Sequence, residues 1–356
     1  MTDKVKEVDK KEVKFKPGVG IDIGTSFLVV VRQTEDGTFV NKFHRNCLFA
    51  MDINDESADL LERSNYFFIK TNDKYYVCGE DAISLVNAIG KGNIIRPMKD
   101  GILNPNLKES SDLLFHIIKS VLGEPIIKQE PLRFTIPANT IDGEKDNLFH
   151  KMVLQGLFTK MGYDAKPINE AMCVIYDNNP ISKNDEGELP LTGIASSHGA
   201  GQTNVCLSFK GMSLAEFSCT KSGDNIDEQV EKVTGISKSK IVKIKEKKLD
   251  LGNIDQNDKV QTALSIFYDE TINRVIHNIS EQFRDKSSEV EGELEWVVAG
   301  GTSMPPNFCK KLEEAIKKSN LPFKIYRVRH AAQPFTSVGQ GACIRALADY
   351  QKTLKK

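Results

Sequence analysis

The apolar positions near the start of the chain follow the short period of β-strands. Residues 19–23 are mostly apolar, residues 28–33 begin with a second apolar run, and residues 38–43 mix apolar and polar side chains. The Glu-Asp-Gly sequence at residues 35–37 is typical of a β-hairpin turn. The pattern predicts a meander of three strands.

The same order of strand, glycine-rich turn and strand returns about halfway along the chain. Residues 191–196 lead into a turn at residues 198–203, residues 204–209 leave it, and residues 213–219 extend the meander. Few residues match between the two stretches, but the repeated order of elements indicates an internal duplication of one fold unit.

Apolar residues spaced three and four positions apart predict helices between these strands. The clearest example is residues 110–122, where Leu113, Leu114, Ile117 and Ile118 share one helical face. Strands that alternate with helices are typical of the α/β class. The other predicted helices are 144–161, 170–176, 226–233, 238–248, 260–283, 308–318 and 338–350, and the other predicted strands are 66–70, 74–78, 132–137, 165–168, 296–299 and 323–328.

The bulk properties of the chain set limits on its partners and its compartment. The 356 residues predict about two domains of ~150 residues each, and 40% apolar residues suffice for an ordinary core. The formal charge of −1 gives no argument for nucleic acid as a partner, and no run of ~18 apolar residues predicts a membrane-spanning helix. Seven scattered cysteines without a Cys-x-x-Cys pair argue against a disulfide framework or a zinc site and favour a reducing cytoplasm.

Two polar segments suggest where the folded units begin and cross. Residues 1–17 alternate charged residues with single valines and are expected to form a disordered tail. A membrane-surface helix is the alternative for this segment, although its apolar face would be narrow. The polar stretch 178–190 is the expected crossing between two lobes.

The first strand runs directly into an Asp-x-Gly-Thr-Ser turn at residues 22–26. Gly24 permits a tight bend, so that its N–H group and those of Thr25 and Ser26 could point at one oxyanion. Asp22 stands at the strand end, where a carboxylate can hold water on a magnesium ion. This turn is expected to form one half of a phosphate clamp.

Two further glycine-rich turns follow strands in the same way. One spans residues 199–203 (Gly-Ala-Gly-Gln-Thr) and the other spans residues 300–304 (Gly-Gly-Thr-Ser-Met). The paired glycines at 300–301 would let the backbone approach a flat ring or a ribose closely. Each cluster alone has a structural explanation, since tight turns need glycine, but their joint order predicts two facing turns around one polyphosphate.

Together these motifs resemble those of the actin, heat-shock chaperone and sugar-kinase ATPase superfamily, and those of the MreB-type bacterial actins most. Residues 19–26 and 194–203 resemble the two phosphate motifs, and residues 298–305 resemble the adenosine motif, nearly as it stands in actin. The likeness covers residues 18–350. The other matching segments are the MreB-like stretch 96–103, the connecting helices at 168–172 and 338–342, and the Gly-Asp-x-x-Asp-Glu motif at 223–228.

The resemblance implies a two-lobed actin-like ATPase fold, with duplicated ribonuclease-H-like mixed sheets and ATP–Mg²⁺ in the cleft between them. Residues 18–177 with 336–356 would then form domain I, and residues 178–335 would form domain II. Asp22 would order magnesium-bound water, and Glu170 would position or polarise the attacking water. The phosphates would be held by Gly24, Thr25, Ser26, Gly199, Gly201, Gln202 and Thr203, and the ribose and adenine by Gly223, Lys245, Gly300, Gly301, Thr302 and Met304.

Three positions in or beside the second phosphate motif shape the expected chemistry. Ser197 stands where the motif normally opens with aspartate, and Asn204 stands at a later acidic or histidine position. Loss of a carboxylate beside a divalent ion should weaken metal binding by on the order of a few kcal/mol. His198 could donate a proton to phosphate, although a strand histidine beside a turn is more often packed or exposed to solvent. We therefore expect ATP binding with slow hydrolysis.

Two of the assignments have a plainer structural alternative. Glu170 begins a short helix, where the helix dipole favours a solvated carboxylate. The lysine-rich stretch 238–248, which includes Lys245, also has the composition of a solvated helix face. A polyanion-binding patch is a third interpretation of these lysines, and the near-neutral charge of the chain argues against it.

The expected function is that of an actin-like cytoskeletal protein. Identical two-lobed subunits would stack head to tail into filaments, and ATP between the lobes would favour the state that polymerises. The expected partners are further copies of the chain and ATP or ADP, no nucleic acid is expected, and membrane contact is left open. The alternatives are a nucleotide-dependent regulator or chaperone-like module that does not polymerise, and a small-molecule kinase of the same fold.

Overall fold

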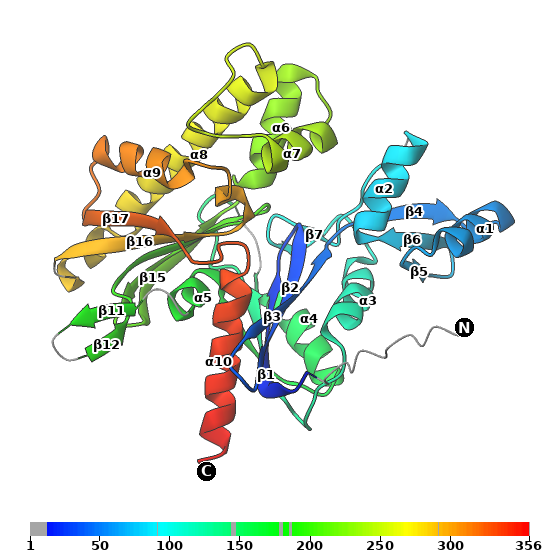
Figure 1. Cartoon of the computed structure of the whole chain (residues 1–356), viewed down its shortest axis with the longest axis horizontal. Coiled ribbons are helices and arrows are strands. Elements are labelled where there is room, and N and C mark those ends of the chain that lie inside the picture. The colour runs from blue at the N-terminus through cyan, green and yellow to red at the C-terminus, as the bar shows by residue number, and fades with distance from the viewer. Residues whose placement is uncertain are drawn as a thin grey trace, which may run out of the picture.

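Two five-stranded sheets with the same strand order form the frame of the molecule (Figure 1). The computed structural model describes residues 13–90, 92–143, 147–177, 181–184, 187–290 and 292–355. In each sheet three parallel strands continue into an antiparallel meander, so the predicted α/β class and the duplicated mixed sheets are confirmed. The first sheet has the order β10 (Asp164–Asn169), β9 (Pro131–Ile136), β1 (Phe15–Ile23), β2 (Phe27–Thr34) and β3 (Phe39–Arg45), and the second has the order β17 (Lys324–His330), β16 (Glu293–Ala299), β13 (Gly193–His198), β14 (Thr203–Phe209) and β15 (Met212–Cys219).

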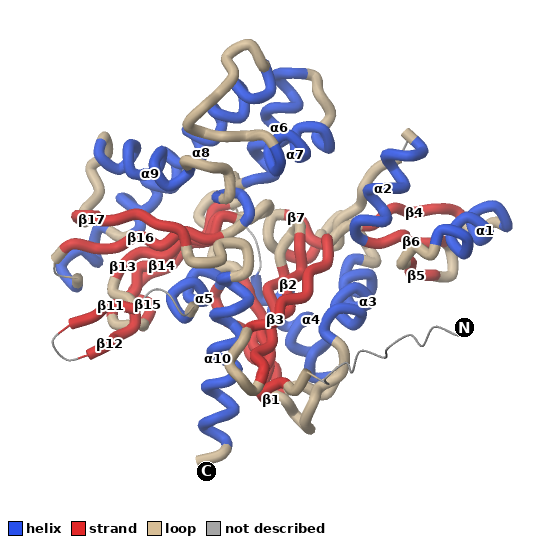
Figure 2. Tube along the Cα trace, in the orientation of Figure 1, coloured by secondary structure: helices blue, strands red, loops and turns tan. Residues whose placement is uncertain are grey.

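Helices cover the outer face of each sheet and also lie between the two sheets (Figure 2). Two helices, α3 and α4, bury an apolar core against the first sheet, and α6 to α9 bury a second core against the other sheet. We call these units the first and second lobes. The helices α5 and α10 lie between them and contact β1, β13 and each other. The bounds are α3 (Ser110–Leu122), α4 (Asn147–Lys160), α5 (Glu170–Tyr176), α6 (Gly223–Thr234), α7 (Lys238–Lys247), α8 (Lys259–Gln282), α9 (Phe308–Lys317) and α10 (Ser337–Thr353).

The crossing of α5 and α10 depends on a glycine. A Cβ atom at Gly341 would lie 1.8 Å from the carbonyl oxygen of Cys173, so no side chain fits there. The helices therefore approach each other to backbone contact. This contact fixes α5, and with it the position of Glu170 at the start of that helix.

The first lobe carries an added unit with its own small core, to which Tyr75 and Leu85 contribute (Figure 1). The hairpin predicted at 66–70 and 74–78 is present, as β5 and β6, and it pairs with a strand that the sequence pattern did not predict. A short hairpin, β7–β8, lies in the MreB-like stretch 96–103. The bounds are β4 (Leu48–Asp52), α1 (Asp55–Ser64), β5 (Phe68–Lys70), β6 (Lys74–Cys78), α2 (Gly79–Ile89), β7 (Met98–Lys99) and β8 (Ile102–Leu103).

Three predicted boundaries differ from the structure or lie outside it. Most of the predicted tail, residues 1–17, lies outside the described residues, but residues 15–17 already belong to β1. The polar stretch 178–190 contains a hairpin, β11 (Ile181–Asn184) with β12 (Gly187–Pro190), in place of the expected loop. The helix predicted from residue 144 begins at Asn147, and residues 144–146 lie outside the described part.

The described part of the chain contains no candidate for a membrane-spanning helix. None of the helices there combines the length and the apolar character that a membrane span requires.

Candidate functional site

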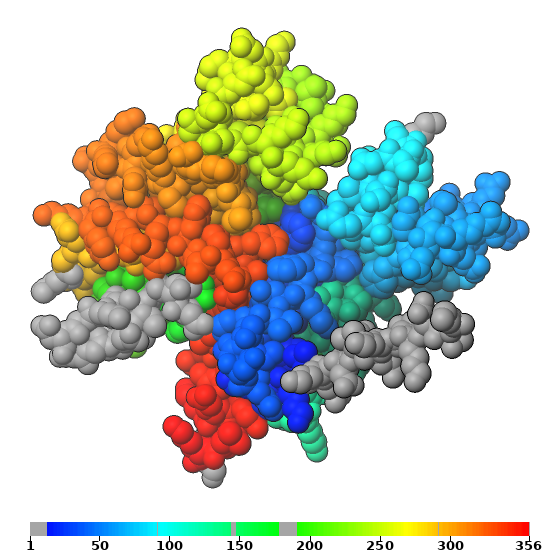
Figure 3. All heavy atoms as spheres, in the orientation of Figure 1, coloured from blue at the N-terminus to red at the C-terminus, as the bar shows by residue number. Residues whose placement is uncertain are grey.

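A cavity of about 660 Å³ lies between the two lobes. In the space-filling view the surface is indented between the yellow-green segment of α6 and α7 and the cyan segment of α2 (Figure 3). The cavity brings together all three glycine-rich turns and both carboxylates that the sequence singled out. The predicted residues that line it are Asp22, Gly24, Thr25, Ser26, Glu170, Gly199, Gly201, Gln202, Lys245, Gly300, Gly301, Thr302 and Met304.

Two of the predicted site residues lie behind the lining. The hydroxyl of Thr203 is buried and shares a hydrogen bond of 2.9 Å with the hydroxyl of Ser222. The N–H of Gly223 donates to the carbonyl oxygen of Gly199 at 3.2 Å. Both residues thus support the turn at 199–202 from behind, and neither lines the cavity wall.

The two phosphate-motif turns have the same backbone geometry. Gly24 N–H donates to the carbonyl oxygen of Phe27 at 2.9 Å, and Gly199 N–H donates to the carbonyl oxygen of Gln202 at 2.9 Å. The prediction that the Gly24 N–H points at an anion is therefore wrong, because that group closes the turn itself. Any backbone donors for an anion must come from the residues that follow each glycine.

The two turns and the β7–β8 hairpin touch one another at one edge of the cavity. Gly101 N–H donates to the hydroxyl of Thr25 at 3.0 Å, and the Gln202 amide donates to the carbonyl oxygen of Asp100 at 2.8 Å. A Cβ atom at Gly201 would lie 2.2 Å from the Thr25 hydroxyl oxygen, so glycine is required there. These contacts join the two facing turns at this edge.

Two carboxyl groups lie beside these turns: Asp22, at the end of β1, and Glu170, at the start of α5. The Thr135 hydroxyl donates to Asp22 Oδ1 at 2.8 Å, and the Asn204 amide of the second lobe donates to Glu170 Oε2 at 3.0 Å. Burial raises the pKa of Asp22 to about 6, and the Thr135 hydrogen bond opposes that rise. Burial, and then the charge of Asp22, raise the pKa of Glu170 well above its usual range. The pair therefore favours a bound proton near neutral pH.

This donor set fits a magnesium ion that is completed by phosphate and water. Carboxylate oxygen is a preferred magnesium ligand, and magnesium is commonly held by one or two carboxylates together with substrate phosphates. In the described part of the chain no three histidine, cysteine, aspartate or glutamate side chains gather around one point. The buried Oε1 of Gln202 has no hydrogen-bond partner within the same part, which is costly unless a ligand or water donates to it.

The second lobe places neutral groups where the first places acids. Ser197 lines the cavity and is 3% exposed. His198 does not line it: its Nε2 lies 2.9 Å from the Ser196 hydroxyl, and its ring packs edge-on against Phe308. Burial lowers the pKa of His198 to about 3, so the ring is neutral. Of the interpretations of His198, the structure favours the packed one.

The third turn lies directly against the second. The Thr302 hydroxyl donates to the carbonyl oxygen of Gly199 at 2.8 Å, and the Tyr268 hydroxyl donates to the carbonyl oxygen of Thr302 at 3.0 Å. Gly300 has a φ of 95°, a conformation that favours glycine. Met304 is 48% exposed at the rim of this corner.

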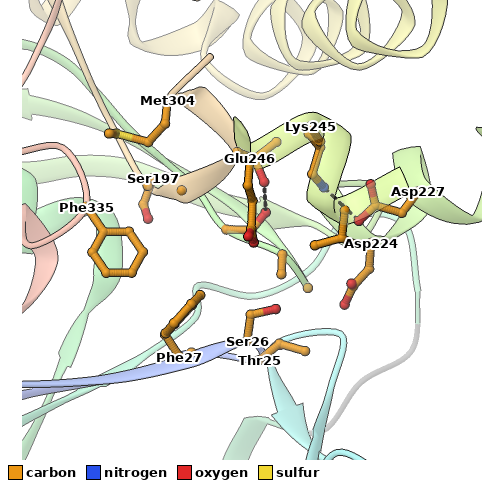
Figure 4. Close-up of a pocket in the computed structure, with 18 of the residues that line it drawn as sticks. Thr25, Ser26, Phe27, Ser197, Asp224, Asp227, Lys245, Glu246, Met304 and Phe335 are labelled. Atoms are coloured by element: carbon orange, nitrogen blue, oxygen red, sulfur yellow. Dashed lines mark hydrogen bonds and ion pairs between the residues drawn. The ribbon is translucent and has the colours of Figure 1, made fainter. Parts of the chain in front are cut away.

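A charged wall from α6 and α7 closes the cavity opposite Thr25 and Ser26 (Figure 4). Lys245 points to Asp227, with an ion pair of 2.7 Å, and its ammonium also donates to the carbonyl oxygen of Gly223 at 3.3 Å. Lys245 is therefore a buried and paired residue of the cavity and does not belong to a solvated helix face.

Several lining residues were not assigned a role from the sequence. Asp224 and Arg96 stand inside motifs that were noted, so they could have been found there. Arg45 and Phe335 carried no local signal, because a strand end and a loop far apart in the sequence bring them to the cavity, and Glu246 stands in the lysine-rich stretch 238–248. The unassigned residues drawn in Figure 4 include Phe27, Asp224, Asp227, Glu246 and Phe335.

Comparison with known proteins agrees with this architecture. The profile of the Volactin family matches residues 18–346, while no curated protein sequence matches the chain. MamK, solved as a double helical filament, has a TM-score of 0.65 at 18% identity, with 93% of this chain and 98% of that chain covered. MreB5 of Spiroplasma citri bound to AMPPNP has a TM-score of 0.64 at 15% identity, with 95% and 96% covered.

A third solved structure is also similar to the chain. The ethanolamine utilization protein EutJ from Carboxydothermus hydrogenoformans has a TM-score of 0.53 at 12% identity, with 93% of this chain and 92% of that chain covered. At these identities the likeness concerns the fold. The predicted resemblance to the actin-like superfamily and to MreB-type proteins is confirmed at that level.

Proposed function

The chain belongs to the Volactin family, and from that premise we propose that it is an actin-like cytoskeletal protein that binds ATP and assembles into filaments. One observation carries the proposal. Three glycine-rich turns and two carboxyl groups, drawn from both lobes, line a single cavity of about 660 Å³. A cavity that both lobes build can couple the occupant to the angle between the lobes.

The roles of the lining residues follow from their chemistry. The turns after Gly24 and Gly199 would hold the phosphates from two sides, and the corner at Gly300 would hold the adenosine. Asp22 would hold magnesium through oxygen, and the ion would neutralise phosphate charge. Glu170 would accept a proton from the attacking water, which requires its charged form. A cation beside the pair favours that form.

Hydrolysis is proposed to be slow. The second lobe offers Ser197 and Asn204 to the cavity region, and neither carries a charge. The magnesium ion that would neutralise the phosphates would therefore be held chiefly by Asp22. A slow reaction suits a switch that changes state after assembly.

Self-assembly is supported by the neighbouring structures. MamK is described as a double helical filament, and MreB5 has been crystallised with AMPPNP and with ADP. We propose that copies of this chain stack head to tail, an arrangement that leaves an open polymer when rotation does not close it. All seven cysteines are free, which fits a reducing cytoplasm.

The test uses the purified full chain with Mg²⁺–ATP, with Mg²⁺–ADP and without nucleotide. Sedimentation and negative-stain microscopy report assembly, and phosphate release reports hydrolysis. We expect filaments with ATP and turnover far below that of a metabolic kinase. A monomer that binds ATP but never assembles would contradict the proposal and support a regulator. Rapid transfer of phosphate to a small molecule would support a kinase.

A further inference from the structure

Two arginines of the first lobe reach across the cavity to acidic residues of the second lobe. Arg96, in the segment before β7, pairs with Asp224 of α6, and Arg45, at the end of β3, pairs with Glu246 of α7. All four residues line the cavity. In both pairs the arginine belongs to one wall and the carboxylate to the other.

The Arg96–Asp224 pair is the stronger of the two. Nη1 of Arg96 lies 2.8 Å and 2.7 Å from the two carboxylate oxygens of Asp224, and both side chains are mostly buried. Arg96 holds the pKa of Asp224 below its usual range although burial opposes this. Lys238, from the same lobe as Asp224, adds a weaker contact at 3.5 Å.

The Arg45–Glu246 pair is weaker but its arginine is held firmly in place. Nη2 of Arg45 lies 3.6 Å from Glu246 Oε2. On its own lobe, Arg45 Nε donates to Glu80 at 2.6 Å, and the guanidinium lies 4.4 Å from the centre of the Phe27 ring. The guanidinium would therefore keep its place if Glu246 moved away with its lobe.

A second junction between the lobes has a different chemistry. The segment 138–141 bonds to β15 through backbone groups: Ser218 N–H donates to Asn139 at 2.9 Å, and Ile141 N–H donates to Ser218 at 3.0 Å. The Asn204 side chain joins this junction to the acidic pair, because it accepts from Ala138 N–H at 2.9 Å and donates to Glu170. We call residues 138–141 with Ser218 the seam.

We propose that the pairs Arg45–Glu246 and Arg96–Asp224 form a latch that sets how fast a bound nucleotide leaves the cavity. The inference rests on the proposed function, since it concerns regulation of the same site. A ligand held between both walls leaves when the walls separate, and separation breaks both ion pairs. The latch consists of side-chain ion pairs, whose charges can pair with water and salt ions when they separate. The seam consists largely of backbone hydrogen bonds. The two walls of the cavity therefore separate at the latch.

The experiment measures release of a fluorescent ATP analogue from the full chain, chased with excess ATP in a stopped-flow instrument with Mg²⁺ present. Arg96→Gln is expected to speed release by about tenfold, because it removes charge-assisted hydrogen bonds. Arg45→Gln is expected to speed release by about threefold, as for a more exposed pair. Arg63→Gln is the matched control, since Arg63 pairs with Asp59 on the surface of α1 and should leave release unchanged.

Two further measurements test the latch even if a single variant fails to fold correctly. Added salt should speed release from the unaltered chain, and this salt dependence should be smaller in the Arg45→Gln, Arg96→Gln double variant. A double-mutant cycle of Arg45→Gln with Glu246→Gln should give non-additive release rates. If the analogue binds and release is indifferent to salt and to both arginines, the latch is overturned and nucleotide binding stands. If the analogue does not bind at all, the proposed function itself fails.

Discussion

The two hairpins that face each other across the cavity share a backbone and differ in their chemistry. Each hairpin has a glycine whose N–H closes the turn by a hydrogen bond of 2.9 Å to a carbonyl oxygen three residues later. The residue two positions before that glycine faces the cavity, and we call it the site position. The site position is Asp22 in the first lobe and Ser197 in the second. The strand beside Asp22 supplies the Thr135 hydroxyl, whereas the strand beside Ser197 supplies Ala299.

The two hairpins thus share their backbone geometry, while only the first carries a carboxylate at this position. Asp22 belongs to the first lobe and Glu170 to α5 between the lobes, while the second lobe contributes the Asn204 amide, which donates to Glu170. A divalent ion would thus have a charged ligand, Asp22, in the first lobe and the uncharged Ser197 at the matching position of the second lobe. Variants that move charge between the hairpins test this asymmetry directly.

The largest effect is expected for the carboxyl group that would act as the base. Glu170→Gln should slow ATP hydrolysis by about 10²-fold or more while ATP still binds, because the amide cannot accept a proton. Single-turnover phosphate release, with affinity measured separately, checks this. Glu216→Gln is the control, since burial also raises the pKa of Glu216 but that residue lies outside this cavity. Equal rates for all three proteins would remove Glu170 from the mechanism.

The next largest effect should separate the two hairpins. Asp22→Asn should weaken Mg²⁺-dependent ATP binding by about 100-fold, because a charged oxygen ligand is lost. Ser197→Ala, at the matching position, should change it by less than about threefold, since no charge is removed. Titration calorimetry at several Mg²⁺ concentrations compares them. Similar losses in both variants would mean that the ion is shared evenly between the lobes.

A gain of charge in the second lobe is expected to have a moderate effect. Ser197→Asp should tighten Mg²⁺-dependent ATP binding by about tenfold, because it adds a second charged oxygen opposite Asp22. The same variant should melt at a lower temperature than the unaltered chain when Mg²⁺ is absent, since a third acid joins a buried pair. Weaker Mg²⁺ binding would show that this position does not face the ion.

The smallest effect concerns the pH dependence of stability without nucleotide or metal. The pKa of Asp22 is about 6 in the fold and 3.8 when exposed, so the protonated form is favoured in the folded state. The resulting stabilisation is complete below about pH 4 and is lost as the pH rises through 6. Asp22→Asn lacks this loss, so its advantage in unfolding free energy should grow between pH 4 and 7, to at most about 3 kcal/mol. A constant difference across that range would show that Asp22 is not desolvated.

Most of the scaffold could be predicted from the sequence because its signals are local. The helix α3 and the short helix α5 have the predicted bounds, and the glycine turns end the strands as expected. The added unit of the first lobe was only partly predicted: its hairpin was expected, whereas α1 and α2 were missed although each has an apolar face. The hairpin within 178–190 was missed because its strands are polar.

The site residues that stand within a single sequence motif could be predicted. The contacts that form where the two lobes meet could not. Asp22, Glu170 and the glycines each stand at a strand or helix end, which the sequence marks. The partners of Arg45 and Arg96 depend on how the closed lobes align, and no local pattern records that alignment. The hydrogen bond from Gly24 N–H to the carbonyl oxygen of Phe27 also could not be predicted, because it depends on the hairpin geometry and not on residue type.

The backbone contact between α5 and α10 has a mechanical consequence. Peptide groups meet at Gly341 without intervening side chains, so this point cannot repack into an alternative fit. The place of Glu170 at the cavity is therefore set by contact between backbone atoms and does not depend on how neighbouring side chains pack.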